Sequence, residues 1–194
     1  MNARQKLLKR FYPLFMRVGK WFGFHNTILL NNHNSRPPVS IYSLNAIENS
    51  GSTFSFSNLT GKKILIVNTA SDCGYTAQLK QLQELQYEYS GKLFIIGFPS
   101  NDFKQQEKLN DQEIQSFCIT NYGISFTIMK KNGVVSENIQ PVYKWLTDPK
   151  LNGWNSQEPE WNFCKYLVDE NGTLIGYFSS AVSPFDNAIL RHIK

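Results

Sequence analysis

The chain has 194 residues, of which 41% are apolar and 14% are aromatic. This supports one compact domain with one core and leaves too little chain for two ordinary domains and a linker. The formal net charge is +5, yet residues 1–38 hold seven Lys or Arg and no Asp or Glu, so the rest has 13 basic and 15 acidic residues, a net charge of −2. A nearly neutral body argues against a basic groove that binds nucleic acid.

The amino-terminal segment has a basic amphipathic pattern. Within residues 4–22, apolar side chains recur mostly at three- and four-residue steps with Lys and Arg between them, although Pro13 breaks or kinks the pattern. Two interpretations stay open: a helix that packs its apolar face on the body or a partner, and a segment that lies on an anionic membrane surface. No apolar run suits a bilayer span and no export signal is recognisable, so we expect a cytoplasmic protein with peripheral membrane contact as an option.

The following segment predicts where the main domain starts. Residues 31–38 are rich in Asn and end in Pro37 and Pro38, a composition typical of a linker. We therefore expect a basic amphipathic arm with its linker over residues 1–38 and one folded domain over residues 39–194.

The first half of this domain predicts a parallel crossover unit. An apolar run within residues 62–69 indicates a buried strand, apolar spacing over residues 76–89 predicts a helix, and a second apolar run at residues 93–96 indicates another buried strand. A strand, a helix and a strand in this order form a parallel pair with a helical connection.

The second half predicts further helices and an antiparallel hairpin. We expect helices over residues 110–121, 141–146 and 184–193, a strand over residues 126–129, and strands over residues 165–168 and 173–178 joined by an Asn171-Gly172 turn. Parallel strands followed by an antiparallel hairpin predict an α/β fold with a mixed central sheet and helices on both faces, compatible with a thioredoxin-like layout.

The cysteine pattern favours redox or catalytic use. The three cysteines are Cys73, Cys118 and Cys164. An odd number at wide spacing is not the disulfide framework of a small secreted domain. Because there is no Cys-x-x-Cys pair and the three histidines lie far from each cysteine in sequence, we expect no metal site.

Cys73 follows the first buried strand, where a helix is predicted to begin. Ligands meet the carboxyl ends of strands in such sheets, and a helix amino terminus can lower the pKa of a cysteine so that the nucleophilic thiolate forms at neutral pH. Thr76 stands where a redox Cys-x-x-Cys motif has its second thiol. Taken alone, a cysteine in such a turn is more often a small buried packing residue.

Three sequence blocks resemble the glutathione peroxidase family. They are Asn-Thr-Ala-Ser-Asp-Cys-Gly-Tyr-Thr at residues 68–76, Gly-Phe-Pro-Ser-Asn-Asp-Phe-Lys-Gln-Gln-Glu-Lys at residues 97–108, and Trp-Asn-Phe-Cys-Lys-Tyr-Leu-Val-Asp at residues 161–169. The order and spacing match the family over roughly residues 39–194. The resemblance implies a thioredoxin-like fold and a thiol peroxidase that reduces hydrogen peroxide and organic or lipid hydroperoxides without a cofactor.

The resemblance also implies a catalytic group of Cys73, Gln106, Trp161 and Asn162. The two side-chain amides and the indole N–H donate hydrogen bonds and do not titrate, so they can stabilise a thiolate and a developing alkoxide without neutralising either. Outside these blocks, the amides would be interpreted as solvated loop residues and the tryptophan as a core aromatic.

The blocks also depart from the family pattern. The departures are Thr69, Ser100, Asp102, Lys104, Lys108 and Thr127. Lys104 replaces a glycine, which puts the backbone path of the loop before Gln106 in question.

Cys118 is the candidate resolving cysteine. Residues 113–123 resemble the helix that carries the resolving cysteine in the thioredoxin-dependent, two-cysteine branch, which implies recycling by thioredoxin rather than glutathione. A sulfenic acid on Cys73 must be reduced before it is overoxidised. A disulfide needs α-carbons within about 7 Å, so we expect a local opening of the fold. The alternative for Cys118 is a packing role, the one role expected for Cys164.

The remaining expectations concern assembly and rival functions. The insertion that accompanies tetramers and glutathione binding in the family is absent between the second and third blocks, so we expect a monomer. A thiol-disulfide oxidoreductase, a peroxide sensor that relays oxidation to a partner, and a non-catalytic binding module anchored by the arm stay open. Thr76 argues against the first because that chemistry uses Cys-x-x-Cys.

Overall fold

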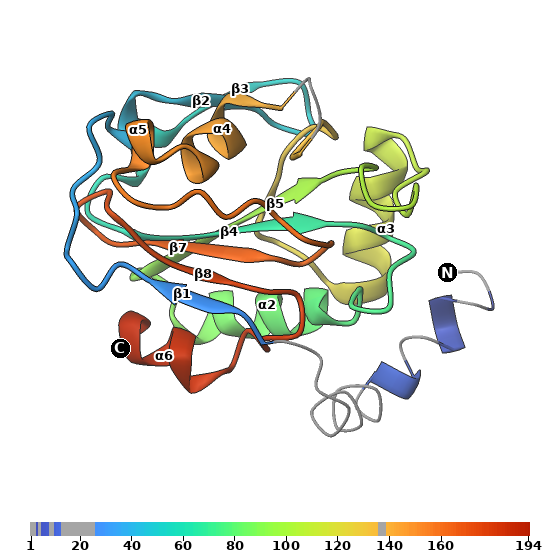
Figure 1. The fold of residues 1–194 in the computed structure, drawn as a ribbon. Helices are drawn as coiled ribbons and strands as arrows, with labels where there is room; N and C mark the ends of the chain where they lie inside the picture. The colour runs from blue at the N-terminus through green and yellow to red at the C-terminus, as the bar shows by residue number, and fades with distance from the viewer. Residues whose placement is uncertain (1–2, 4, 8–9, 13–25, 136–138) are drawn as a thin grey trace.

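A six-stranded sheet forms the centre of the protein. The computed structural model describes residues 3, 5–7, 10–12, 26–135 and 139–194. The strands are β1 (Ile28–Leu30), β4 (Lys63–Thr69), β5 (Leu93–Pro99), β6 (Thr127–Ile128), β7 (Lys165–Val168) and β8 (Leu174–Phe178), in the order β1-β8-β7-β4-β5-β6 across the sheet (Figure 1). A separate small sheet pairs β2 (Asn45–Ile47) with β3 (Thr53–Ser55).

The central sheet is mixed, as the sequence predicts. β4 runs parallel to β5, which runs parallel to β6, whereas β7 is antiparallel to both β4 and β8 and β1 is antiparallel to β8. Helix α2 (Gln78–Glu88) connects β4 to β5 and confirms the predicted crossover. Because β7 is antiparallel to β4, the segment that enters β7 lies beside the end of β4. The same edge holds the end of β5, where Ser100 N donates to Thr69 O at 3.0 Å.

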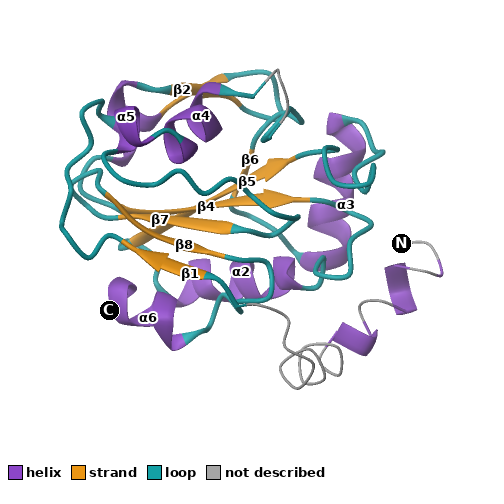
Figure 2. Ribbon diagram, in the orientation of Figure 1, coloured by secondary structure: helices purple, strands orange, loops and turns teal. Residues whose placement is uncertain are grey.

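Helices cover both faces of the sheet, which confirms the predicted architecture. Helices α2, α3 (Asp111–Tyr122) and α6 (Asn187–Ile193) contribute to the core on one face. The other face is covered by α4 (Pro141–Thr147), α5 (Pro149–Asn152), the β2-β3 sheet and two short 3-10 helices, Ile41–Ser43 and Phe56–Leu59 (Figure 2).

The strands divide the apolar core into two clusters by the alternation of their side chains. On β4, Leu65 and Val67 join the cluster under α2 and α3, whereas Ile64 and Ile66 join the cluster under α4. Neighbouring side chains of a strand point to opposite faces, so a strand buried on both faces is apolar at every position. This is why the predicted strands are continuous apolar runs rather than alternating patterns.

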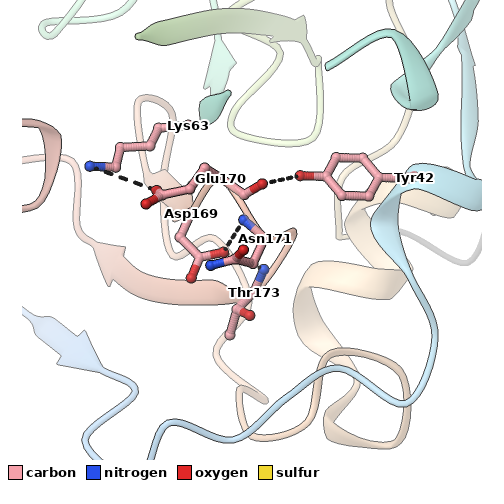
Figure 3. A network of polar contacts seen from close by, with 6 residues as sticks. All are labelled: Tyr42, Lys63, Asp169, Glu170, Asn171 and Thr173. Carbon is pink, nitrogen blue, oxygen red and sulfur yellow. Dashed lines mark hydrogen bonds and ion pairs between the residues drawn. The ribbon is translucent and has the colours of Figure 1, made fainter. Parts of the chain in front are cut away.

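The β7-β8 hairpin confirms the predicted turn. The Asp169 carboxylate accepts hydrogen bonds from the backbone N–H groups of Asn171 and Thr173 at 2.9 and 2.8 Å (Figure 3). The hydroxyl of Tyr42 donates to the carbonyl of Glu170 at 3.0 Å, which ties the turn to the first 3-10 helix. These contacts hold the turn between the end of β7 and the start of β8.

The sheet begins before the predicted domain boundary at Val39. Strand β1 pairs Ile28 with Phe178 and Leu30 with Gly176, and Asn31 N donates to Ile175 O at 3.1 Å. Asn31, the first residue of the predicted linker, therefore still hydrogen-bonds to the sheet. The prediction missed β1 because three residues are too few to show a strand period, and the strand exists only through its pairing with β8.

The amino-terminal arm is described at residues 3, 5–7 and 10–12, which are helical, and the rest of the predicted amphipathic segment lies outside the described residues. Gln5 Nε2 donates to Ser71 O at 3.2 Å, and the buried Tyr12 donates its hydroxyl to Gln81 Oε1 at 3.2 Å. The arm thus contacts the end of β4 and the start of α2. Among the described residues, no helix has the length and apolar character needed to cross a membrane.

Candidate active site

Cys73 lies in a tight turn between β4 and α2, here called the Cys73 turn (residues 70–76). The Thr76 hydroxyl closes this turn, since it accepts from Cys73 N at 3.0 Å and donates to Ala70 O at 2.8 Å. Thr76 N also donates to Cys73 O at 3.1 Å. A hydroxyl at the position of a second redox thiol therefore fixes the backbone of Cys73.

Cys73 is 1% exposed, and its thiol is surrounded by donors from two parts of the chain. Tyr75 N donates to the sulfur at 3.4 Å from within the turn. The side chains of Trp161 and Asn162, from the segment before β7, act on the thiol as hydrogen-bond donors that lower its pKa. The structure thus brings together Cys73 and two of the residues predicted to act with it.

The buried side chain of Asn68 at the end of β4 holds the segment before β7. Its Nδ2 donates to Trp161 O at 2.9 Å, and the backbone carbonyl of Asn68 accepts from Phe163 N at 2.6 Å. Phe163 has φ of 69°, a left-handed conformation that costs a residue with a side chain roughly 1–2 kcal/mol. Strained backbone of this kind persists where the surrounding contacts determine it, and here it aims Trp161 and Asn162 at Cys73.

Burial raises the pKa of the Cys73 thiol, while hydrogen bonds from Tyr75 N, Trp161 and Asn162 lower it by a smaller amount. The expectation that a helix amino terminus would lower this pKa is therefore wrong for this arrangement. Helix α2 begins at Gln78, after residues that form turns rather than helix, so its first N–H groups do not surround the sulfur. Desolvation of the thiolate outweighs the donors that favour it.

Gln106 lies next to Asn162 in the site. Its Oε1 accepts a hydrogen bond from Asn162 Nδ2 at 2.9 Å, and its backbone carbonyl accepts from Asp72 N at 3.0 Å. Gln106 was expected to donate to the sulfur, but in these contacts it is an acceptor that orients the Asn162 amide. It also links its own loop to the residue before Cys73.

The loop before Gln106 keeps a left-handed path despite losing its glycine. Lys104 and Gln105 have φ of 49° and 52°. The Lys104 Nζ lies 5.4 Å from the Trp161 ring centroid, a cation–π distance, and so adds a contact that glycine lacks. Asp102 is another departure from the family pattern. Its carboxylate accepts from Val134 N and Val135 N at 2.7 and 3.1 Å, and so it anchors a neighbouring loop.

Glu107 is a buried residue at the site that the sequence reasoning missed. One carboxylate oxygen accepts from Ser71 N at 2.8 Å and the other accepts from the Ser71 hydroxyl at 2.8 Å. The side chain is nearly inaccessible, since Glu107 is 2% exposed. A buried glutamate is uncommon unless it is paired, so its place inside the second sequence block, directly after Gln106, was the available signal.

The other two cysteines lie on opposite faces of the sheet. Cys118, on α3, is 5% exposed and belongs to the same apolar cluster as Cys73. Burial, followed by the charge of Glu107, raises the pKa of Cys118 to about 12. Cys164 belongs to the cluster on the other face. All three thiols are free.

Cys164 is expected to matter for stability. Its sulfur accepts the hydroxyl hydrogen bond of Tyr177 at 3.3 Å and lies 3.5 Å from Ser180 Oγ. Cys164→Ala should lower the free energy of unfolding by about 1–3 kcal/mol, because it leaves a buried hydroxyl without its acceptor. Cys164→Ser retains an acceptor and should lose less. Urea unfolding of both variants measures this, and an equal loss would contradict the role of the Tyr177 bond.

Lys165, in the third sequence block, is expected to make stability depend on pH. Its Nζ donates to Val182 O at 2.6 Å, and burial lowers its pKa to about 7. The unfolded chain, with a lysine pKa of about 10.4, then binds more protons than the folded chain between these values, so this residue makes stability rise with pH there.

Lys165→Met should remove that dependence. Between pH 7 and pH 8.5 the wild type is expected to gain about 1.5 kcal/mol of unfolding free energy relative to the variant. Urea unfolding at the two pH values measures the difference, and parallel pH profiles would show that the lysine stays charged in the folded protein.

The chain is similar to known proteins over most of its length. Residues 41–147 match the family model of glutathione peroxidase. Glutathione peroxidase-like peroxiredoxin 2 of Saccharomyces cerevisiae is 44% identical over 147 residues, which are 75% of this chain and 91% of the yeast protein. Hydroperoxy fatty acid reductase gpx1 of Synechocystis sp. is 38% identical over 153 residues, which are 75% of this chain and 89% of that protein.

Solved structures share the fold. The crystal structure of Trgpx in apo form has a TM-score of 0.62 at 29% identity and covers 80% of this chain and 96% of Trgpx. A thioredoxin family protein from Chlorobium tepidum TLS has a TM-score of 0.53 at 16% identity, over 83% of this chain and 98% of that chain, which concerns the fold alone. The predicted thioredoxin-like fold is therefore confirmed.

Proposed function

Because the chain belongs to the glutathione peroxidase family and is a thiol peroxidase that reduces hydroperoxides, we propose that Cys73 is its reacting residue and that Trp161 and Asn162 stabilise the Cys73 thiolate. The observation that carries this proposal is the convergence of donors on one buried sulfur from segments that are far apart in sequence. Gln106 is assigned the orientation of Asn162.

In the first step the Cys73 thiolate attacks one oxygen of the hydroperoxide and the O–O bond breaks. The sulfur is oxidised to a sulfenic acid, and the peroxide is reduced to an alcohol, or to water when the substrate is hydrogen peroxide. The thiol proton ends on the leaving oxygen, so no external acid is consumed. Trp161 and Asn162 donate without titrating, and they favour the thiolate and the departing oxygen at every pH.

We assign the second step to Cys118 and the third to thioredoxin. The Cys118 thiol attacks the sulfenic sulfur, which forms a Cys73–Cys118 disulfide and releases water. A thioredoxin dithiol then reduces this disulfide and is itself oxidised. The name peroxiredoxin among the relatives supports this order, as does the location of Cys118 in the same apolar cluster as Cys73.

The test is peroxide-dependent NADPH consumption with two recycling systems, thioredoxin with its reductase and glutathione with its reductase. We expect turnover with thioredoxin for the wild type and none for Cys73→Ser. Turnover by Cys73→Ser would remove Cys73 from the reaction. Slow turnover together with rapid mixed-disulfide formation on a client protein would favour the sensor instead.

We further propose that the arm brings the enzyme to anionic membrane surfaces and so to lipid hydroperoxides. Leu7 and Phe11 are 57% and 49% exposed, next to the exposed Lys6 and Arg10. Apolar side chains flanked by basic ones, in a segment without acidic residues, suit an anionic bilayer surface. The contacts of Gln5 and Tyr12 with the body place this surface beside the Cys73 turn.

Sedimentation with phosphatidylserine-containing vesicles tests the arm. We expect binding by the wild type, weaker binding to vesicles of phosphatidylcholine alone, and loss of binding on charge reversal with Lys6→Glu and Arg10→Glu. Turnover of hydrogen peroxide should stay unchanged in that variant, because neither residue belongs to the site. Equal binding after removal of residues 1–25 would assign membrane contact to another surface.

A further inference from the structure

Glu107 connects the Cys73 turn to the loop that carries Gln106. Its two carboxylate oxygens hold Ser71 through the backbone N–H and the hydroxyl, both at 2.8 Å. In the opposite direction, Asp72 N donates to Gln106 O at 3.0 Å. Three hydrogen bonds therefore join Ser71 and Asp72, which directly precede Cys73, to Gln106 and Glu107.

Hydrogen bonds also anchor the backbone of Glu107, so the position from which its side chain extends is fixed. Its N–H donates to Asn101 Oδ1 at 3.0 Å, and its carbonyl accepts from Lys131 Nζ at 3.4 Å. A carboxylate that accepts two short hydrogen bonds from one residue at 2% exposure is a rigid link rather than a solvated side chain.

Burial raises the pKa of Glu107 to about 7, whereas its hydrogen bonds with Ser71 and Leu109 and the charge of Lys131 favour the ionised carboxylate. The contacts with Ser71 therefore stabilise the carboxylate at the point where it links the two segments.

We propose that Glu107 is a positioning residue that clamps the Cys73 turn through Ser71 for attack on the hydroperoxide. The clamp stands on the two hydrogen bonds between the Glu107 carboxylate and Ser71. It rests on the proposed role of Cys73 as the reacting residue.

Two substitutions separate the hydrogen bonds from the charge. Glu107→Gln keeps an oxygen that accepts from Ser71 N and an amide that donates to the Ser71 hydroxyl, but it removes the charge. Glu107→Ala removes both. Glu113→Gln is the matched control, since Glu113 is an exposed carboxylate on α3 whose capping contact a glutamine can also make.

The experiment uses the full chain and hydrogen peroxide in single-turnover rapid quench, with sulfenic acid trapped by dimedone and the disulfide resolved by mass spectrometry. We expect Glu107→Ala to slow Cys73 oxidation about tenfold, Glu107→Gln to restore the rate to within about threefold of the wild type, and Glu113→Gln to match the wild type. Circular dichroism checks the fold of each variant.

Unchanged Cys73 oxidation in a folded Glu107→Ala would overturn the clamp. Equal slowing in Glu107→Gln and Glu107→Ala would assign the effect to the charge rather than to the hydrogen bonds with Ser71, and would also overturn the clamp. If the wild type shows no oxidation of Cys73 at all, the proposed function itself fails and the clamp fails with it.

Discussion

Turnover supported by thioredoxin is expected to fall to background when Cys118 is replaced by serine, while the first oxidation of Cys73 by hydrogen peroxide proceeds at the wild-type rate. Serine has nearly the shape of cysteine but cannot form a disulfide, so the sulfenic acid on Cys73 would accumulate and become overoxidised. Dimedone trapping after one equivalent of peroxide, followed by NADPH consumption with thioredoxin and its reductase, measures the two steps separately.

Cys164→Ser is the matched control for this substitution. Both cysteines are buried, but Cys164 lies in the apolar cluster on the opposite face of the sheet from Cys73. Its replacement should leave thioredoxin turnover in place. If Cys118→Ser keeps its turnover, the reductant reaches Cys73 directly and Cys118 is a packing residue of α3.

The proposed resolving step also requires a conformational change, which we assign to helix α3. Cys118 lies in the last turns of α3, which is capped by Gly123 with a left-handed φ of 63°. The amino terminus of the helix is held by a capping box between Asn110 and Glu113. Fraying from the carboxyl end would expose Cys118 and lower its raised pKa by hydration, and both changes favour attack on the sulfenic acid.

Replacing Trp161 by phenylalanine is expected to slow the oxidation of Cys73 by about 10²-fold. Phenylalanine preserves an aromatic ring but lacks the indole N–H that hydrogen-bonds to the thiol. Removal of one preorganised donor of this kind typically lowers a rate by about 10²–10³-fold. The measurement is the second-order rate constant of the wild type and the variant with hydrogen peroxide under single-turnover conditions.

Trp154→Phe controls for the loss of an indole. Its N–H donates to Leu174 O at 2.7 Å, in the core cluster on the face away from Cys73. That variant should lose stability without losing reactivity. If the two substitutions lower the rate constant equally, the effect would come from destabilisation rather than from the donor at the sulfur.

Local sequence features predicted most elements because their signals do not depend on distant parts of the chain. The capping pair at Asn110 and Glu113 marks the start of α3, and both hydrogen bonds of the box form, at 2.9 and 2.8 Å. The Asp169 turn likewise forms from contacts between neighbouring residues. β1 escaped prediction because its three residues become a strand only against β8.

Sequence motifs predicted the candidate residues but not the contacts between their side chains. Gln106 was expected as a donor to the sulfur, and the structure makes it the acceptor that orients Asn162. No role was predicted for Glu107, the next residue, because a carboxylate in a loop is ordinarily solvated. Only the packing of this loop against Ser71 turns it into a buried link.

By itself, the sequence determined the α/β class, the chain order of the main elements and the candidate reacting cysteine, since apolar periodicity, caps and short motifs depend only on neighbouring residues. The tertiary structure decided what surrounds Cys73. Antiparallel pairing of β7 with β4 brings Trp161 and Asn162 to the sulfur, and burial then raises the pKa that a helix terminus was expected to lower. Desolvation depends on every atom that excludes water, so it cannot be seen in the residues next to Cys73 in the chain.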